Sequence, residues 1–334
     1  MSRYRTPLQG YGRVSGLSLI ELMIAMVLGL LVVGAAIGIF MSNRQTYRAT
    51  ESLARVQENA RTAFELMARD VREAGGNPCV NTLPVANVLN APATRWWTNL
   101  TEWGAAVRGY RSDEAFPDAA FGSGAGDRVN GTEAIQLLSG DDNVVTISAH
   151  NTGGTQFTLN RANHGFAAGD LLMACNSRQA SIFQATAVGG VNITHASGGA
   201  SPGNCTGNLG LPVQCGAGTV FAFSAPNSVL VKLHSTRWYI GNNGRGGLSL
   251  YQSRLQNGAI VSQEVAEGVR TMQVTYLVRG DNAYSTAQAV TTNNAWANVV
   301  ALRINLGLED TERTEGGTVR RNLIQVASLR NRNA

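Results

Sequence analysis

The sequence predicts an α+β fold in which a long N-terminal helix is followed by a β-rich globular head. Three observations indicate this fold class. An uncharged apolar run of membrane length extends from Leu22 to Met41, and an amphipathic pattern of helical period continues from it to Ala74. After Pro78 the apolar residues alternate with period two between turn residues. The 334 residues, 44% of them hydrophobic and 15% charged, exclude a disordered chain and suffice for one large or two ordinary domains.

The apolar run predicts a transmembrane helix. Its twenty residues, Leu22 to Met41, would span about 30 Å at a rise of about 1.5 Å per residue, which is the thickness of a bilayer core. The run is longer than the roughly 7–15 apolar residues of a cleaved secretory signal. Residues 1–16 contain three arginines and no acid, so the positive-inside rule leaves the N-terminus in the cytoplasm and the head in the periplasm. A plain signal anchor does not explain Glu21, because an acid within a membrane segment costs about 2.5–3.5 kcal/mol.

Residues 16–21 resemble the processing signature of type IV prepilins. A short basic leader is followed by Gly16, Leu17 and Ser18, by Glu21 five residues after the glycine, and then by the apolar run. In that family a membrane-embedded prepilin peptidase cuts after the glycine and N-methylates the new first residue. The resemblance implies that residues 1–16 are removed and that the mature chain begins at Leu17, where the family most often has phenylalanine.

The resemblance also implies a role for Glu21 in assembly. Cleavage creates a positive amine at Leu17, and in a filament Glu21 of an incoming subunit would neutralise the amine of a neighbour. Leaving one member of such a pair alone in apolar surroundings costs about 3–5 kcal/mol. We therefore expect Glu21 to fix the position of each subunit relative to its neighbour in the filament.

Three glycines inside the apolar run are candidates for helix packing. Gly34 and Gly38 are four residues apart, and Gly29 precedes them. Small residues at that spacing let membrane helices approach closely. Simple tolerance of glycine in membrane helices is the alternative, and the sequence leaves both interpretations open.

Residues 42–76 predict an amphipathic stem that continues the membrane half of the helix, residues 17–41. Apolar residues recur every three or four positions from Leu53 to Val71, opposite a charged face that we interpret as solvated. The run Gly75-Gly76-Asn77-Pro78 ends the helix.

Four segments in order along the chain resemble the PilW family of minor pilins. Gly76 departs from this family, which often has an aromatic residue there. The segments are ENARTAFELMARDVREAGG at 58–76, IGNNGRGGLSLYQSR at 240–254, VRTMQVTY at 269–276 and VASLRNR at 326–332.

Residues 77–334 predict a β-rich periplasmic head, built either as one body or as two lobes that divide near residues 195–218, a stretch with the composition of a surface loop. Two of the expected strands are Val269–Val278 and Asn298–Leu306, in which alternation is clear from Val269 to Tyr276 and from Val299 to Leu306. The other expected strands are 133–138, 144–148, 170–174, 182–188, 220–223, 229–233, 248–253 and 323–329.

The four cysteines indicate disulfides rather than zinc, because none lies in a C-x-x-C pair and an even count suits the oxidising periplasm. Three pairings are possible. Cys205 and Cys215 would close the glycine-rich segment between them, which leaves Cys79 with Cys175 as the longer bridge.

The sequence offers no catalytic machinery. The four histidines lack metal-ligand spacing, and no nucleophile elbow, zinc-protease motif or Walker motif occurs, so we expect no enzyme activity, no metal and no cofactor. Without residues 1–16 the chain has 24 basic and 22 acidic residues, a formal charge of +2, which argues against nucleic-acid binding. Three tryptophans close together are better explained by packing than by a binding site: Trp96, Trp97 and Trp103.

The resemblance implies a minor pilin of the inner membrane that joins other minor pilins to prime a type IV pilus and sits at its tip. Its partners would be the prepilin peptidase, other minor pilins, the major pilin, the inner-membrane assembly platform and a large tip adhesin, in a fimbrium used for cell adhesion and twitching motility. One alternative is a pseudopilin of type II secretion or DNA uptake. Another is a signal-anchored periplasmic enzyme or binding protein, which would need a deep polar pocket.

Overall fold

A computed structural model describes residues 16, 18–76, 78–79, 83–99, 106–256, 259–309 and 320–332. The leader before Gly16, Leu17 and Trp103 lie outside the described residues. The chain divides into two compact units, one up to Glu51 and one from Ser52 onward. Helix α1, Leu19–Glu73, contributes residues to both units, and every other element belongs to the second.

In the first unit α1 leaves its apolar side chains uncovered. From Leu19 to Glu51 every residue except Ala49 is exposed, and Leu19 and Leu30 are 76% and 72% exposed. This helix is long and apolar enough to cross a membrane. Because a soluble surface rarely carries an apolar area of this size, the segment is a candidate membrane anchor.

In the second unit the remaining turns of α1 form the centre of a core, as the amphipathic pattern predicts. Val56, Ala60, Phe64, Met67 and Val71 are buried in one cluster with residues of both sheets of the head. The helix ends at Glu73. Gly75 follows in a left-handed conformation with φ +73°, which favours glycine, and its N–H donates to the Leu138 carbonyl at 2.9 Å.

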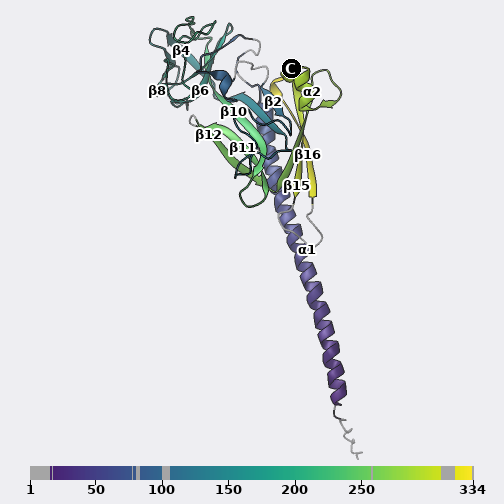
Figure 1. Ribbon diagram of the computed structural model, residues 1–334. Coiled ribbons are helices and arrows are strands. Elements are labelled where there is room, and N and C mark those ends of the chain that lie inside the picture. Colours follow the sequence, from purple (N-terminus) through teal and green to yellow (C-terminus); the bar gives the residue numbers. More distant parts are fainter. Residues whose placement is uncertain are drawn as a thin grey trace, which may run out of the picture. The chain divides into compact units, whose positions relative to one another are not determined.

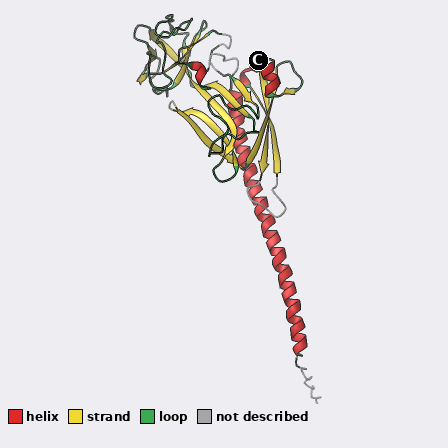
Figure 2. Cartoon of the chain, viewed as in Figure 1, coloured by secondary structure: helices red, strands yellow, loops and turns green. Residues whose placement is uncertain are grey.

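The head contains two sheets (Figures 1 and 2). In the four-stranded sheet the order is β14-β13-β15-β16. In the twelve-stranded sheet the main order is β1-β7-β6-β10-β4-β5-β9-β8, with β11 and β3 also paired to β10, β12 to β11 and β2 to β3. Strand β10 pairs with four others along its length, so it links the parts of the large sheet. Apart from β1 with β7, which are parallel, the ladders between these strands are antiparallel.

The strands have the following bounds: β1 Val85–Asn87, β2 Val107–Tyr110, β3 Ala134–Gly140, β4 Val145–Asn151, β5 Gln156–Leu159, β6 Leu171–Cys175, β7 Ala180–Gln184, β8 Ala187–Gly189, β9 Asn192–Thr194, β10 Val229–Asn242, β11 Leu248–Gln256, β12 Ala259–Glu267, β13 Val269–Val278, β14 Tyr284–Ser285, β15 Val299–Glu309 and β16 Arg320–Ser328. A short helix, α2, spans Ala287–Thr292, and single 3-10 turns span Pro92–Thr94, Trp296–Asn298 and Arg330–Arg332.

One expected strand was wrong. Residues 220–223 form no strand, because Phe223 is fully buried and its N–H donates to His150 Nδ1 at 3.1 Å instead of to a neighbouring strand. A second expected strand, 182–188, is two strands, β7 and β8, since the Ala185 N–H leaves the ladder to bond the Asp170 carbonyl at 2.9 Å.

Residues 195–218 contain no helix or strand element. The segment is tied to the large sheet by buried side chains: Asn204 Nδ2 donates to the Gln184 carbonyl at 2.8 Å, and Ser181 Oγ of β7 donates to the Leu209 carbonyl at 2.7 Å. Division of the head into lobes at this segment stays a prediction.

Candidate functional site

The start of α1 holds the predicted processing and assembly residues, and it forms a local cap. The Ser18 N–H donates to the Glu21 carboxylate at 3.3 Å, and the Ile20 N–H donates to Ser18 Oγ at 3.4 Å. This arrangement of Ser and a Glu three residues later is similar to a capping box, although Ser18 Oγ accepts from the second helical residue and not from the third, and it satisfies backbone N–H groups that a helix start leaves free. Glu21 therefore has a partner within its own chain. The S-x-x-E spacing signals it, although the sequence analysis considered only a partner on another subunit.

The three glycines of the apolar run have open surroundings. Among the described residues, no atom beyond the local helix lies within 4 Å of the position that a Cβ would take at Gly29, Gly34 or Gly38. Contacts within the chain thus give no reason for glycine at these positions, and close approach of another helix stays a prediction.

Asp70 fastens α1 to the large sheet. Its carboxylate accepts from Trp238 Nε1 of β10 and from Gln252 Nε2 of β11, both at 2.8 Å, and pairs with Arg254 Nη2 at 3.2 Å. Burial raises the pKa of Asp70, against the opposing effects of Arg254 and the two neutral donors. Asp70 is therefore an exception to the solvated charged face that the amphipathic pattern predicts for this segment.

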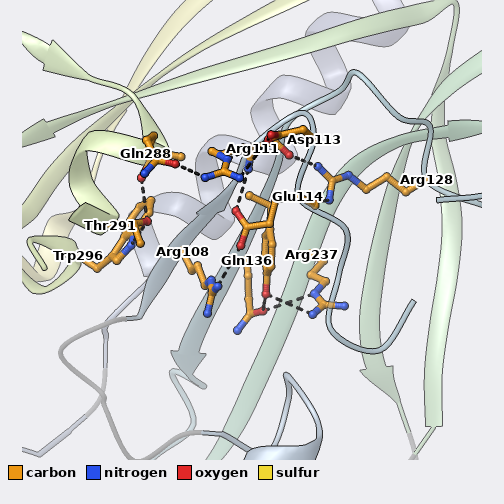
Figure 3. A network of polar contacts seen from close by, with 12 residues as sticks. Arg108, Arg111, Asp113, Glu114, Arg128, Gln136, Arg237, Gln288, Thr291 and Trp296 are labelled. Atoms are coloured by element: carbon orange, nitrogen blue, oxygen red, sulfur yellow. Dashed lines mark hydrogen bonds and ion pairs between the residues drawn. The ribbon is translucent and has the colours of Figure 1, made fainter. Parts of the chain in front are cut away.

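A polar network lies on the other side of β3 and β10, around two buried arginines (Figure 3). The guanidinium of Arg128 donates to the carbonyls of Arg111, Glu114 and Thr132 at 2.6–2.8 Å. Burial and the nearby charge of Arg237 lower the pKa of Arg128 to about 10. These bonds fix the loop between β2 and β3 by its backbone.

Arg237 of β10 is held by aromatic rings and one acid. Its guanidinium lies 4.1 Å from the Phe116 ring centre and 4.2 Å from that of Trp96, and it pairs with Asp118 at 2.7 Å. From α2, Gln288 accepts a hydrogen bond from Arg111, as Figure 3 shows. The network therefore connects β2, β10, α2 and the loop after β2.

A cavity of about 250 Å³ adjoins this network. It is smaller than the roughly 300–1,000 Å³ of sites that enclose drug-sized ligands. Trp96 is 6% exposed and packs beside it, as expected for core packing, and Trp97 is 7% exposed.

Both disulfides of the favoured pairing occur in the structure. Cys79 and Cys175 have Cα atoms 6.1 Å apart and join the segment after α1 to the end of β6. Cys205 and Cys215, at 4.7 Å, close a short loop.

Two of the four histidines contact each other. His150 Nε2 and His195 Nε2 are 3.0 Å apart. Burial lowers the pKa of His150 to about 4, and burial together with His150 lowers that of His195 to about 3. Within the described ranges no three His, Cys, Asp or Glu side chains are grouped to hold a metal ion.

Comparison with known proteins yields one match. Residues 237–330 match the family model of PilW, the type IV pilus-assembly protein W. No curated protein matches the chain, and no solved structure matches it. The matched range begins at Arg237 and includes all three partners of Asp70. The match supports a type IV pilus-associated family and involvement in type IV pilus assembly.

Proposed function

We propose that this chain is a minor pilin, anchored in the inner membrane by α1, that assembles with other minor pilins to prime a type IV pilus and sits at its tip. The observation that carries the proposal is the match of residues 237–330 to the PilW model. The chain acts by helix packing in the membrane and contacts between heads, and it catalyses no reaction.

Two further features support this assignment. The exposed apolar half of α1 suits a helix that first lies in lipid and then packs among other helices in a filament. Gly16, at the predicted cleavage site, is exposed, and among the described residues no atom lies within 4 Å of its Cβ position. A peptidase would therefore have access to the bond that follows it.

Mass spectrometry of the N-terminus of the protein purified from membranes tests the proposal. A chain beginning at N-methylated Leu17 is the expected result. The variant Gly16→Val should accumulate uncut in the membrane fraction, while Gly29→Val, a glycine outside the signature, should be processed normally. An intact Met1 in the native protein, or efficient cutting of Gly16→Val, would contradict the proposal and return the chain to the class of plain anchored proteins.

A further inference from the structure

Two edge strands of the head, β12 and β16, have no strand on their outer side. Within the described part of the chain, β12 pairs only with β11 and β16 only with β15. An edge strand presents unpaired backbone N–H and C=O groups, with which an added strand can pair. Both strands have nine residues, and neither contains the proline or lysine that commonly prevents such pairing. The ladder between β11 and β12 has a bulge after Glu264 and is regular from Ala259 to Glu264.

The two edges also expose large β-branched side chains. Ile324 and Val326 of β16 are 59% and 56% exposed, and Ile260 and Val261 of β12 are 38% and 43% exposed. The ladder between β15 and β16 runs from Ala301 to Glu309 without a bulge, so this edge is regular. A long regular edge with apolar side chains aggregates unless something covers it.

The two edges match each other when the strands are set antiparallel with Val261 opposite Ile324. Four pairs then match, two of them apolar, one of two amides and one of an acid with a base, whereas Ile260 faces Gln325, Ser262 faces Leu323 and Val265 faces Arg320. A shift by two residues keeps apolar pairs such as Val261 with Val326, but it places Arg321 opposite Ala266, so Arg321 no longer faces an acid. The pairs in the matching register are Ala259 with Val326, Val261 with Ile324, Gln263 with Asn322 and Glu264 with Arg321.

The charges at this contact are available. Arg321 forms no ion pair within the described residues. Glu309 of β15, which lies opposite Arg320 in the ladder, already pairs with Arg270 and Arg320. Glu264 pairs with Arg245 at 2.5 Å, but a carboxylate has enough lone pairs to accept from a second guanidinium.

The directions of the strands allow the contact between copies of the same orientation. A single residue, Gly268, joins the end of β12 to the start of β13. The first residue of β13, Val269, lies opposite Leu308 of β15. Leu308 in turn lies opposite Arg321, near the start of β16. The end of β12 and the start of β16 are therefore at the same end of the head, and the two strands run in opposite directions (Figure 1).

We propose that β12 of one copy pairs antiparallel with β16 of a second copy of this chain. Because the two surfaces differ, the contact leaves one β12 and one β16 free and can repeat. The common orientation of the copies rests on the proposed function, in which α1 anchors each of them in one membrane. Anchorage also raises their effective concentration, so a contact of few residues suffices.

Crosslinking between cysteine variants tests this pairing. All four native cysteines are bridged, so an introduced cysteine supplies a free thiol. Full-length Val261→Cys and Ile324→Cys chains with different tags are produced together and oxidised mildly in the membrane. We expect a covalent pair carrying both tags.

Matched controls separate pairing from random collision. Gln325→Cys replaces Ile324→Cys by a neighbour on the opposite face of the same strand, and crosslinking to Val261→Cys should fall about tenfold. Arg321→Glu, added to the Ile324→Cys chain, should lower the yield about fivefold, and Arg321→Lys should not. If either cysteine variant fails to accumulate, Gln263→Cys with Asn322→Cys tests the same register.

Three results would overturn the pairing: no mixed crosslink in either cysteine pair, equal crosslinking through Gln325→Cys, or capture of a different subunit by Ile324→Cys in place of Val261→Cys. Absence of the crosslink in a chain recovered from pili would refute the pairing alone. A crosslinked chain that keeps its leader and never enters pili would refute the proposed function and leave the pairing intact.

Discussion

Glu21 caps α1 through the Ser18 N–H, and a single substitution can separate this contact from the role in assembly that we propose for its charge. Glutamine at this position keeps an oxygen that accepts from the Ser18 N–H, whereas it removes the charge. A helix cap contributes about 1 kcal/mol, and an unpaired buried charge costs about 3–5 kcal/mol. The charge should therefore dominate in assembly.

We predict that Glu21→Gln and Glu21→Ala both insert into the membrane and are both recovered in sheared pili at least about tenfold less than the native chain. Ser18→Ala, which removes only the cap, should be recovered nearly normally. Immunoblots of the membrane and sheared fractions measure this. Normal recovery of Glu21→Gln would show that the cap is what matters.

Asp70 is a second residue whose loss should be measurable. Asp70→Ala leaves Trp238 Nε1 and Gln252 Nε2 without an acceptor, so we predict a loss of about 2–4 kcal/mol in the free energy of unfolding of the head. Asp70→Asn should cost less, because an amide oxygen still accepts and burial already disfavours the charge. Urea unfolding of the full chain in detergent, followed by tryptophan fluorescence, tests this. Glu58→Gln, on the exposed face of α1, is the control, and an equal loss there would refute the role of Asp70.

The His150–His195 pair predicts that the head is sensitive to acid. His150 Nδ1 accepts from the Phe223 N–H, so its Nε2 carries the hydrogen that points at His195. A proton added to His195 Nε2 would make two N–H groups face each other, and they would repel. Because folding lowers both pKa values, to about 4 and about 3, the unfolded chain binds these protons first.

We predict that the stability due to this pair is present above pH 6.5 or so, the ordinary histidine pKa, and is lost as the pH falls toward about 3. Thermal unfolding between pH 7 and pH 4 should show a smaller slope for His195→Phe than for the native chain. Identical slopes would contradict this assignment.

At the scale of elements, the two disulfides should contribute unequally. Cys79–Cys175 closes a loop with a sequence separation of 96 residues, and Cys205–Cys215 one with a separation of 10. The chain-entropy model assigns them about 5 and about 3 kcal/mol. The double variant Cys79→Ser/Cys175→Ser should therefore lower the midpoint of urea unfolding more than Cys205→Ser/Cys215→Ser. The opposite order would show that the short loop is needed for packing.

Elements with strong periodicity could be predicted, and short ones could not. α1 was expected over 17–74 and is described as Leu19–Glu73, and the alternating strands β13 and β15 begin within one residue of their predicted starts. The six-residue α2 was missed because its signal is one turn long, with Thr286 as the cap. β12 was missed because its first five residues are exposed on both faces, so they carry no alternation.

The candidate site was predictable where a motif is local. The S-x-x-E spacing of Ser18 and Glu21 signals the local cap at the start of α1, while the roles of Gly16, Ser18 and Glu21 in processing and assembly stay predictions. The partners of Asp70 lie 168 to 184 residues away in the sequence, and no spacing rule connects them. The same holds for Arg237, whose position between Trp96 and Phe116 depends on the tertiary fold.

At the scale of the whole molecule, the uncovered apolar residues of α1 predict stable membrane attachment. The chain should remain in the membrane pellet after washing with alkaline carbonate, and detergent should release it, because about twenty apolar residues bind lipid far more strongly than surface charges do. Fractionation with immunoblotting measures this. Release by carbonate alone would show that the helix does not span the bilayer.

The second half of α1 is buried among the sheets through Val56, Phe64, Met67 and Val71. This burial limits where the chain can be shortened to obtain the head without its membrane segment. A shortened polypeptide must begin no later than Ser52, where the second compact unit starts. A polypeptide that begins after Glu73 would lack the part of α1 that packs against both sheets, and we expect it to precipitate.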